Sequence, residues 1–277
     1  MEREVYPKHL YEQIRREIGV DYVRHELRKY LPSIKGEVWR RIDQDIEGWF
    51  DEAPFLYPVR DFWNGVHGIM MGFKLYSHLL NFITGENVRW TKEEIELELL
   101  NFGTVNSLVK EMVPEGNEVR LAMSGYLKNE RLRKSHLEEM QKWYEITEER
   151  STNPIIATQK SIEGKDKLVV YDGNGRTTLA VLKGRGKILA YVGRFVDERR
   201  QPENYWLPTS LLMEIVHFVK KAKEMGDDNL YDSYVRVLRD MLDRSDSGRY
   251  EMLNRVVSKG SKFYDEFMVD LDLSRKV

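Results

Sequence analysis

The stretch whose residue types and spacing most suggest chemistry is Asp172-Gly173-Asn174-Gly175-Arg176, followed by two threonines. It comes after the apolar run KLVVY and before TTLAVLKG, a pattern that predicts a turn between a strand and a short helix. A helix that begins after such a turn directs unpaired backbone N–H groups and the positive end of its dipole at the turn. The stretch therefore favours a site for an anion, in particular a phosphate.

Several residues of this turn suit phosphate binding. Gly173 and Gly175 would let the backbone approach the ligand or take up positive φ, and Arg176 is a forked, charged donor. Asp172 would hold Mg²⁺, bind a ribose hydroxyl or cap the helix. A structural alternative stays open, because Asp-Gly and Asn-Gly are ordinary turn dipeptides. The remaining polar side chains of the expected site are Asn174, Thr177 and Thr178.

The elements that must position this turn are predicted from hydrophobic patterns. PIIAT and KLVVY read as two strands joined by a turn at residues 163–166, and KILAYVGRF reads as a returning strand. LRKSHLEEMQKWYEI is an amphipathic helix, and EVRLAMSGYL is compatible with a further strand. Residues 117–201 are therefore expected to form a mixed α/β core.

Helices are expected on both sides of this core. Thr91 and Glu94 form a capping box, which predicts a helix from Lys92 to a break at residues 113–117. Apolar residues recur at spacings of three and four before Lys92 and again after Pro202. The expected division is a helical N-terminal domain at 1–116, the core at 117–201 and a C-terminal helical region at 202–277.

The order PIIAT, KLVVY, DGNGR, TTLAVLKG, KILAYV resembles the ParB/sulfiredoxin-like fold, in which a strand ends in a DG-x-x-R turn before a short helix and a returning strand. The similarity covers about residues 118–197. It implies an α+β protein with a small mixed sheet, and a nucleotide (ATP, ADP or CTP) whose phosphates lie at the turn, with Mg²⁺ at Asp172. Many members have a His before the Arg, where this chain has Gly175.

The resemblance to one branch of that family, the free serine kinases, also implies a general base. LKNERLRKSHLEEM resembles the stretch that carries a catalytic Glu in those proteins, and Glu130 falls at that position. A carboxylate facing a phosphate can accept the proton of an incoming hydroxyl. Arg131 would add to the phosphate clamp. For both residues the alternative is the polar face of a helix.

Two classes of function therefore stay open. The first is a Mg²⁺-dependent phosphotransferase or NTP hydrolase with Glu130 and Asp172 as catalytic residues. The second is a ParB-like DNA-binding, nuclease or regulatory protein that binds its ligand without nucleotide chemistry. DGNGRT also resembles the Fic-type AMP transferases, but their catalytic His lies just upstream of the turn, where this chain has KLVVY.

Composition and charge limit the partners. The 277 residues include no cysteine, which excludes disulfides and thiolate metal sites, and the formal net charge is −2. Residues 119–200 hold 17 Lys and Arg against 11 Asp and Glu, an excess that suits an anionic ligand but does not favour DNA as a partner. The charged start of the chain and the absence of roughly 20 consecutive apolar residues predict a cytoplasmic protein without a membrane partner.

Overall fold

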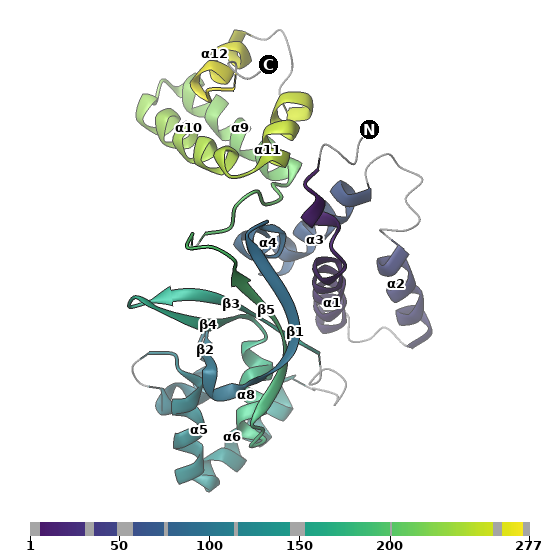
Figure 1. Ribbon diagram of the computed structural model, residues 1–277, viewed down its shortest axis with the longest axis vertical. Helices are drawn as coiled ribbons and strands as arrows, with labels where there is room; N and C mark the ends of the chain where they lie inside the picture. The colour runs from purple at the N-terminus through teal and green to yellow at the C-terminus, as the bar shows by residue number, and fades with distance from the viewer. Residues whose placement is uncertain are drawn as a thin grey trace. The chain divides into compact units, whose positions relative to one another are not determined.

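A computed structural model of the chain describes residues 6–30, 36–48, 58–74, 77–113, 116–144, 153–199, 201–256 and 262–273. The protein is α+β, as expected, with helices and a five-stranded mixed sheet (Figure 1). The chain divides into two compact units, one formed by Val88–Arg200 and the other by Met1–Asn87 together with Gln201–Val277. Over the described ranges, no helix is both long enough and apolar enough to cross a lipid bilayer.

The sheet belongs to the first of these units, and its strands lie in the order β1-β5-β3-β4-β2. The pairs β1–β5 and β3–β4 are antiparallel, whereas β5–β3 and β4–β2 are parallel. The predicted hairpin and the returning strand are confirmed as β3, β4 and β5. The strands are β1 (Val88–Glu96), β2 (Leu100–Phe102), β3 (Ile155–Ile162), β4 (Lys165–Asp172) and β5 (Lys187–Phe195).

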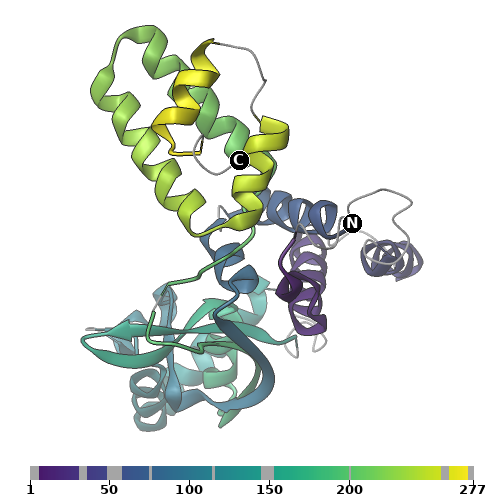
Figure 2. The same cartoon turned by 45° about the horizontal axis from the view of Figure 1, so that its top comes forward.

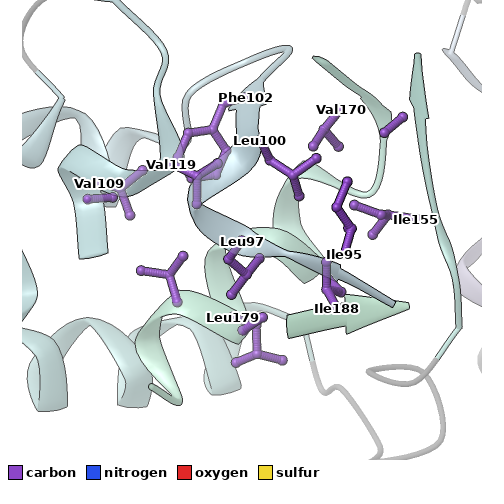
Figure 3. Packing of buried hydrophobic residues seen from close by; sticks show 14 of the residues in the cluster. Ile95, Leu97, Leu100, Phe102, Val109, Val119, Ile155, Val170, Leu179 and Ile188 are labelled. Atoms are coloured by element: carbon purple, nitrogen blue, oxygen red, sulfur yellow. The ribbon is translucent and has the colours of Figure 1, made fainter. Parts of the chain in front are cut away.

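Helices gather on one side of this sheet (Figures 1 and 2). Their apolar side chains meet those of the strands in one core, in which Leu97, Leu100 and Phe102 are almost completely buried (Figure 3). The short helix α8 is buried from Arg176 to Leu182, so the core fixes its position firmly. Among the described residues of this unit, the helical elements are η3 (Leu97–Leu99), η4 (Ser107–Met112), α5 (Val119–Lys128), α6 (Glu130–Tyr144) and α8 (Asn174–Leu182).

The prediction of a helix starting at Lys92 is wrong, because residues 88–96 form the edge strand β1. β1 pairs with β5 over its whole length, from Val88 opposite Phe195 to Glu96 opposite Lys187. This ladder satisfies the backbone groups that a helix would otherwise satisfy, and it overrides the local capping pattern.

The prediction of a strand for EVRLAMSGYL is also wrong, because this segment forms the helix α5. Its buried residues Val119, Ala122 and Tyr126 are spaced by three and four, which is the period of a helix face. The expected boundary at 116–117 differs from the division at 87–88, since β1 and β2 lie before it and belong to the sheet. The second expected boundary, at 201–202, lies next to the division at 200–201.

The other unit is helical, as expected on both sides of the core, but its two parts belong together. The Tyr6 hydroxyl donates to Glu251 Oε1 at 2.8 Å, and the Trp206 backbone N–H donates to Thr84 Oγ1 at 3.0 Å. These bonds tie the start of the chain to its C-terminal helices. The elements are η2 (Lys8–Tyr11), α1 (Gln13–Tyr30), α2 (Gly36–Gly48), α3 (Pro58–Lys74), α4 (Ser77–Thr84), α9 (Thr209–Met225), α10 (Asp228–Asp243), α11 (Asp246–Glu251), a π-helical turn η5 (Met252–Val256) and α12 (Lys262–Asp270).

Candidate functional site

The glycine turn lies where the sequence predicts it, between the end of β4 and the start of α8. Gly173 is the residue before the helix and has φ of 101°, in the left-handed region. A Cβ atom at this position would lie 2.5 Å from Ile155 Cγ2, so a larger residue would meet both backbone strain and a steric clash. The turn therefore requires glycine at residue 173 for reasons internal to the fold.

Asn174, the first residue of α8, joins this turn to a second loop. Its Oδ1 accepts the backbone N–H groups of Gly103 at 3.0 Å and of Thr104 at 3.3 Å. Residues 103 and 104 follow β2, which is the parallel neighbour of β4. The carboxyl ends of two parallel strands thus meet at the start of α8, a position at which α/β proteins commonly bind ligands.

Arg176 does not face outward from the turn. Its Nη2 forms an ion pair with Asp172 Oδ2 at 2.7 Å, and its Nη1 donates to the backbone carbonyls of Asn153 at 2.9 Å and Pro154 at 2.6 Å. Both charged side chains are about 95% buried, with exposed fractions of 6% and 5%. The guanidinium therefore holds the start of β3 against the turn, and its Nη1 and Nη2 donors, which were expected to bind a phosphate, are used inside the protein.

The two threonines after Arg176 are buried as well. Thr177 Oγ1 donates to the backbone carbonyl of Gly173 at 3.1 Å, and Thr178 is fully buried in the helix. Gly175 is half-buried at the second position of α8. The donors that stay available to a ligand at this site are the backbone N–H groups of the first turn of α8. Gly173 provides no side-chain cap for them, and the Asn174 side chain is bound to the neighbouring loop.

Glu130, the expected general base, is not brought to this turn. It is the first residue of α6 and pairs at the surface with Lys134 at 3.2 Å and Arg133 at 3.8 Å. Arg133 Nη1 donates to the carbonyl of Leu182, the last residue of α8, at 3.0 Å. Because a helix rises 1.5 Å per residue, the turn at the start of α8 lies about 13 Å from Leu182 at its end. Arg131 follows Glu130 in α6 and is exposed.

A pocket of about 420 Å³ lies beside Glu130 and was not predicted from the sequence. Among its lining residues Tyr126 is buried, and its hydroxyl lies 2.7 Å from His136 Nδ1. Burial raises the pKa of the Tyr126 phenol, so this wall of the pocket is uncharged at neutral pH. The lining consists of Met123, Tyr126, Leu127, Glu130, Arg133, Val181 and residues 184–186.

The Asp172 carboxylate, which is expected to hold Mg²⁺, is engaged in the ion pair with Arg176. Asp172 is buried, and its Oδ2 is held by the Arg176 guanidinium, which a metal ion would have to displace. In nucleotide sites, Mg²⁺ is bound by one or two carboxylates together with substrate phosphates and waters. In the described part of the chain, no three His, Asp or Glu side chains are grouped closely enough to hold a metal ion.

Comparison of the chain with protein-family models, with curated proteins and with solved structures finds no match. The resemblance to the ParB/sulfiredoxin-like fold therefore stays a hypothesis based on the DGNGR turn and on the order of its neighbouring strands. The arrangement of the turn itself can bind an anion through backbone amides. It places no exposed acidic or nucleophilic side chain beside those amides among the turn residues 172–178.

Proposed function

We propose that residues 88–200 bind a phosphate group of a nucleotide at the N-terminal end of α8, through backbone amides. The observation that carries this proposal is the start of α8, where Gly173 supplies no side-chain cap and Asn174 Oδ1 is occupied by the loop after β2. The unpaired N–H groups and the helix dipole there attract an anion. The parallel strands β2 and β4 both end at this point, which favours the same location.

In this proposal the Asp172–Arg176 pair positions the turn and does not contact the ligand. The two side chains fix the start of β3 and the first turn of α8 relative to each other through three short hydrogen bonds. A rigid turn lowers the entropy that is lost when a ligand binds. The ParB-like resemblance supports the same ligand class, with Arg176 in a supporting role.

The geometry favours binding without chemistry over a phosphotransferase or NTP hydrolase. A general base must come within hydrogen-bond reach of the proton that it removes. Glu130 lies at the far end of α8, and Asp172 is buried in its ion pair. We therefore propose a nucleotide-binding or nucleotide-sensing domain as the function of this unit.

A thermal-shift experiment with one charge substitution tests this proposal. Wild-type protein is melted with ATP, ADP, CTP and GTP, each with and without Mg²⁺, and saturating ligand at 100 times Kd stabilises by about 2.7 kcal/mol. Asn174→Asp keeps the acceptor for Gly103 and Thr104 but adds a negative charge beside the proposed phosphate. We expect Asn174→Asp to remove the nucleotide-dependent shift while the melting temperature without ligand stays close to that of the wild type.

The matched control is Asn229→Asp, which adds the same charge near the exposed start of α10 in the other unit. This variant should keep the full nucleotide-dependent shift. If no nucleotide stabilises the wild type, or if Asn174→Asp retains the shift, the proposed phosphate site is wrong.

A further inference from the structure

The positive charge of residues 119–200 is concentrated in two short stretches. Residues 128–134 and 183–187 together contain seven Lys and Arg and one acidic residue, Glu130. Their excess of six equals the whole excess of residues 119–200, so the rest of that segment is neutral on balance. The basic residues are Lys128, Arg131, Arg133, Lys134, Lys183, Arg185 and Lys187.

The fold brings these two stretches together, although they are about 50 residues apart in the sequence. Arg133 Nη1 donates to the carbonyl of Leu182, directly before the second stretch, and a Cβ on Gly184 would lie 3.4 Å from the same Nη1. Arg133 and Arg185 both line the pocket of about 420 Å³. We refer to the seven basic residues and this pocket as the basic surface.

The basic residues of this surface are accessible to a ligand. Lys128, Arg131, Lys134 and Arg185 are exposed, and Lys187 is 54% exposed even though it pairs with Glu96. Glu130 pairs with Arg133 and Lys134, and Glu96 pairs with Lys187, so the seven cations keep a net positive charge. A polyanion that follows the surface would offset this charge.

The pocket that Arg133 and Arg185 line also has apolar walls. Met123, Val181 and Leu127 contribute them, and Leu127 is 85% exposed and so accessible to a ligand. The volume lies within the range of ordinary small-ligand pockets. Apolar walls next to Arg133 and Arg185 match a ligand that alternates phosphates with flat, weakly polar rings.

We propose that the basic surface binds single-stranded nucleic acid, with phosphates along the seven basic residues and an unstacked base in the pocket. A single small anion would need only two or three of these cations. Single strands are favoured over a duplex because the base must enter a pocket, which a paired and stacked base cannot do. This inference does not rest on the proposed nucleotide site, which lies at the opposite end of α8.

The test measures binding of a fluorescein-labelled 20-mer of deoxythymidine by fluorescence anisotropy at 50 to 200 mM salt. The key variant is Lys128→Gln/Arg131→Gln/Arg185→Gln, since none of these exposed side chains makes a hydrogen bond or ion pair within the described residues. We expect at least a tenfold loss of affinity. The slope of log K against log salt should fall by about 2, at about 0.7 for each phosphate contact on a single strand.

The matched control is Lys110→Gln/Lys160→Gln/Lys165→Gln, which removes the same charge from exposed positions of the same unit outside the basic surface. It should bind the 20-mer within about twofold of the wild type if the surface, and not the net charge, attracts the strand. An equal loss of affinity in both triple variants would overturn the proposal.

Two single substitutions separate the two parts of the surface. Leu127→Ser should weaken binding several-fold with an unchanged salt slope, because it removes an apolar contact and no charge. Glu130→Gln should strengthen binding, because it removes the negative charge that lines the pocket. The proposal fails if the wild type does not bind the 20-mer at 50 mM salt, or if a 20-residue polyglutamate or anionic vesicles displace the 20-mer at equal charge concentration.

The same measurements distinguish this inference from the proposed nucleotide site. Asn174→Asp should leave binding of the 20-mer unchanged. The triple variant of the basic surface should keep the nucleotide-dependent thermal shift. Failure of one site therefore leaves the other testable.

Discussion

At the residue scale, the Asp172–Arg176 pair shows how one set of residues can fit two functions. Both the phosphate clamp expected from the sequence and the buried ion pair observed require a cation four residues after an aspartate. Arg176→Met should lower the free energy of unfolding by about 3 kcal/mol or more, because it leaves the Asp172 carboxylate buried without its partner. Urea denaturation measures this loss.

A double-mutant cycle is the control for that prediction. The loss in the free energy of unfolding for Asp172→Asn/Arg176→Met should be at least about 1 kcal/mol smaller than the sum of the losses of the two single variants. The double variant leaves neither charge buried without its partner. A stable Arg176→Met variant that folds normally but no longer binds nucleotide would instead support the original phosphate-clamp hypothesis.

Gly173 gives a second prediction at this scale, with Gly164 as its matched control. Both glycines have positive φ, but a Cβ at Gly164 would meet nothing within 4 Å, whereas at Gly173 it would meet Ile155 at 2.5 Å. Gly164→Ala should cost about 1 kcal/mol for backbone strain alone. Gly173→Ala should cost at least about 1 kcal/mol more, measured by chemical denaturation, and equal losses would contradict this packing.

At the scale of elements, residues 88–96 form the strand β1 although their capping box predicts a helix. Thr91 and Glu93 lie on one face of β1, where Arg194 of β5 donates to Thr91 Oγ1 at 3.2 Å and to Glu93 Oε1 at 2.5 Å. Hydrogen bonds from Arg194 and then Thr91 lower the pKa of the Glu93 carboxyl. A strand makes this contact possible, because residues two apart share a face.

The prediction is that Arg194→Met raises the pKa of Glu93 toward its ordinary value in an NMR titration. Because the folded pKa is lowered, the pair stabilises the protein above the ordinary carboxyl pKa, and this contribution is lost as the pH falls through the folded value. The change in stability should be below about 1 kcal/mol, since both side chains are substantially exposed. Arg199→Met, which removes a surface partner of Asp197, should leave the Glu93 pKa unchanged.

The elements that the sequence predicts correctly are those whose local pattern agrees with their tertiary environment. KLVVY and KILAYVGRF are apolar runs next to glycine turns, and they form β4 and β5. DGNGR is one of these turns, and it leads from β4 into α8. The prediction for β1 is wrong because WTKEEIE combines a capping box with charged residues that are common in helices. Its strand state depends on pairing with β5, which lies about 100 residues away.

The position of the glycine turn between a strand and a helix was predicted correctly, but the direction of its side chains was not. Whether Arg176 points outward depends on the carbonyls of Asn153 and Pro154, whose approach no local pattern reveals. The spacing of four between Asp172 and Arg176 was the available signal for an ion pair. The basic surface was detectable only as two separate charged stretches, and their convergence requires the contact between α6 and the end of α8.

At the scale of the whole molecule, the two units have separate hydrophobic cores. One core is built from the sheet and its helices, and another from α9 to α12 with Tyr205 and Leu207. Separate cores allow the units to respond differently to the same change in conditions. Buried histidines provide such a difference, because His9 and His67 lie in the unit of Met1–Asn87 and Gln201–Val277.

Acidification from pH 7.5 to 5.0 should therefore lower the melting temperature of that unit selectively. Burial lowers the pKa of His9, with Arg15 adding to the effect, and burial lowers the pKa of His67. The unfolded chain then binds protons below pH of about 6.5 that the folded unit does not, so stability is complete above this pH and is lost as the pH falls. Calorimetry should show a downward shift of one transition, with little change in that of residues 88–200. His67→Leu should reduce the shift, the exposed His217→Leu should not, and equal effects of the two would contradict the assignment.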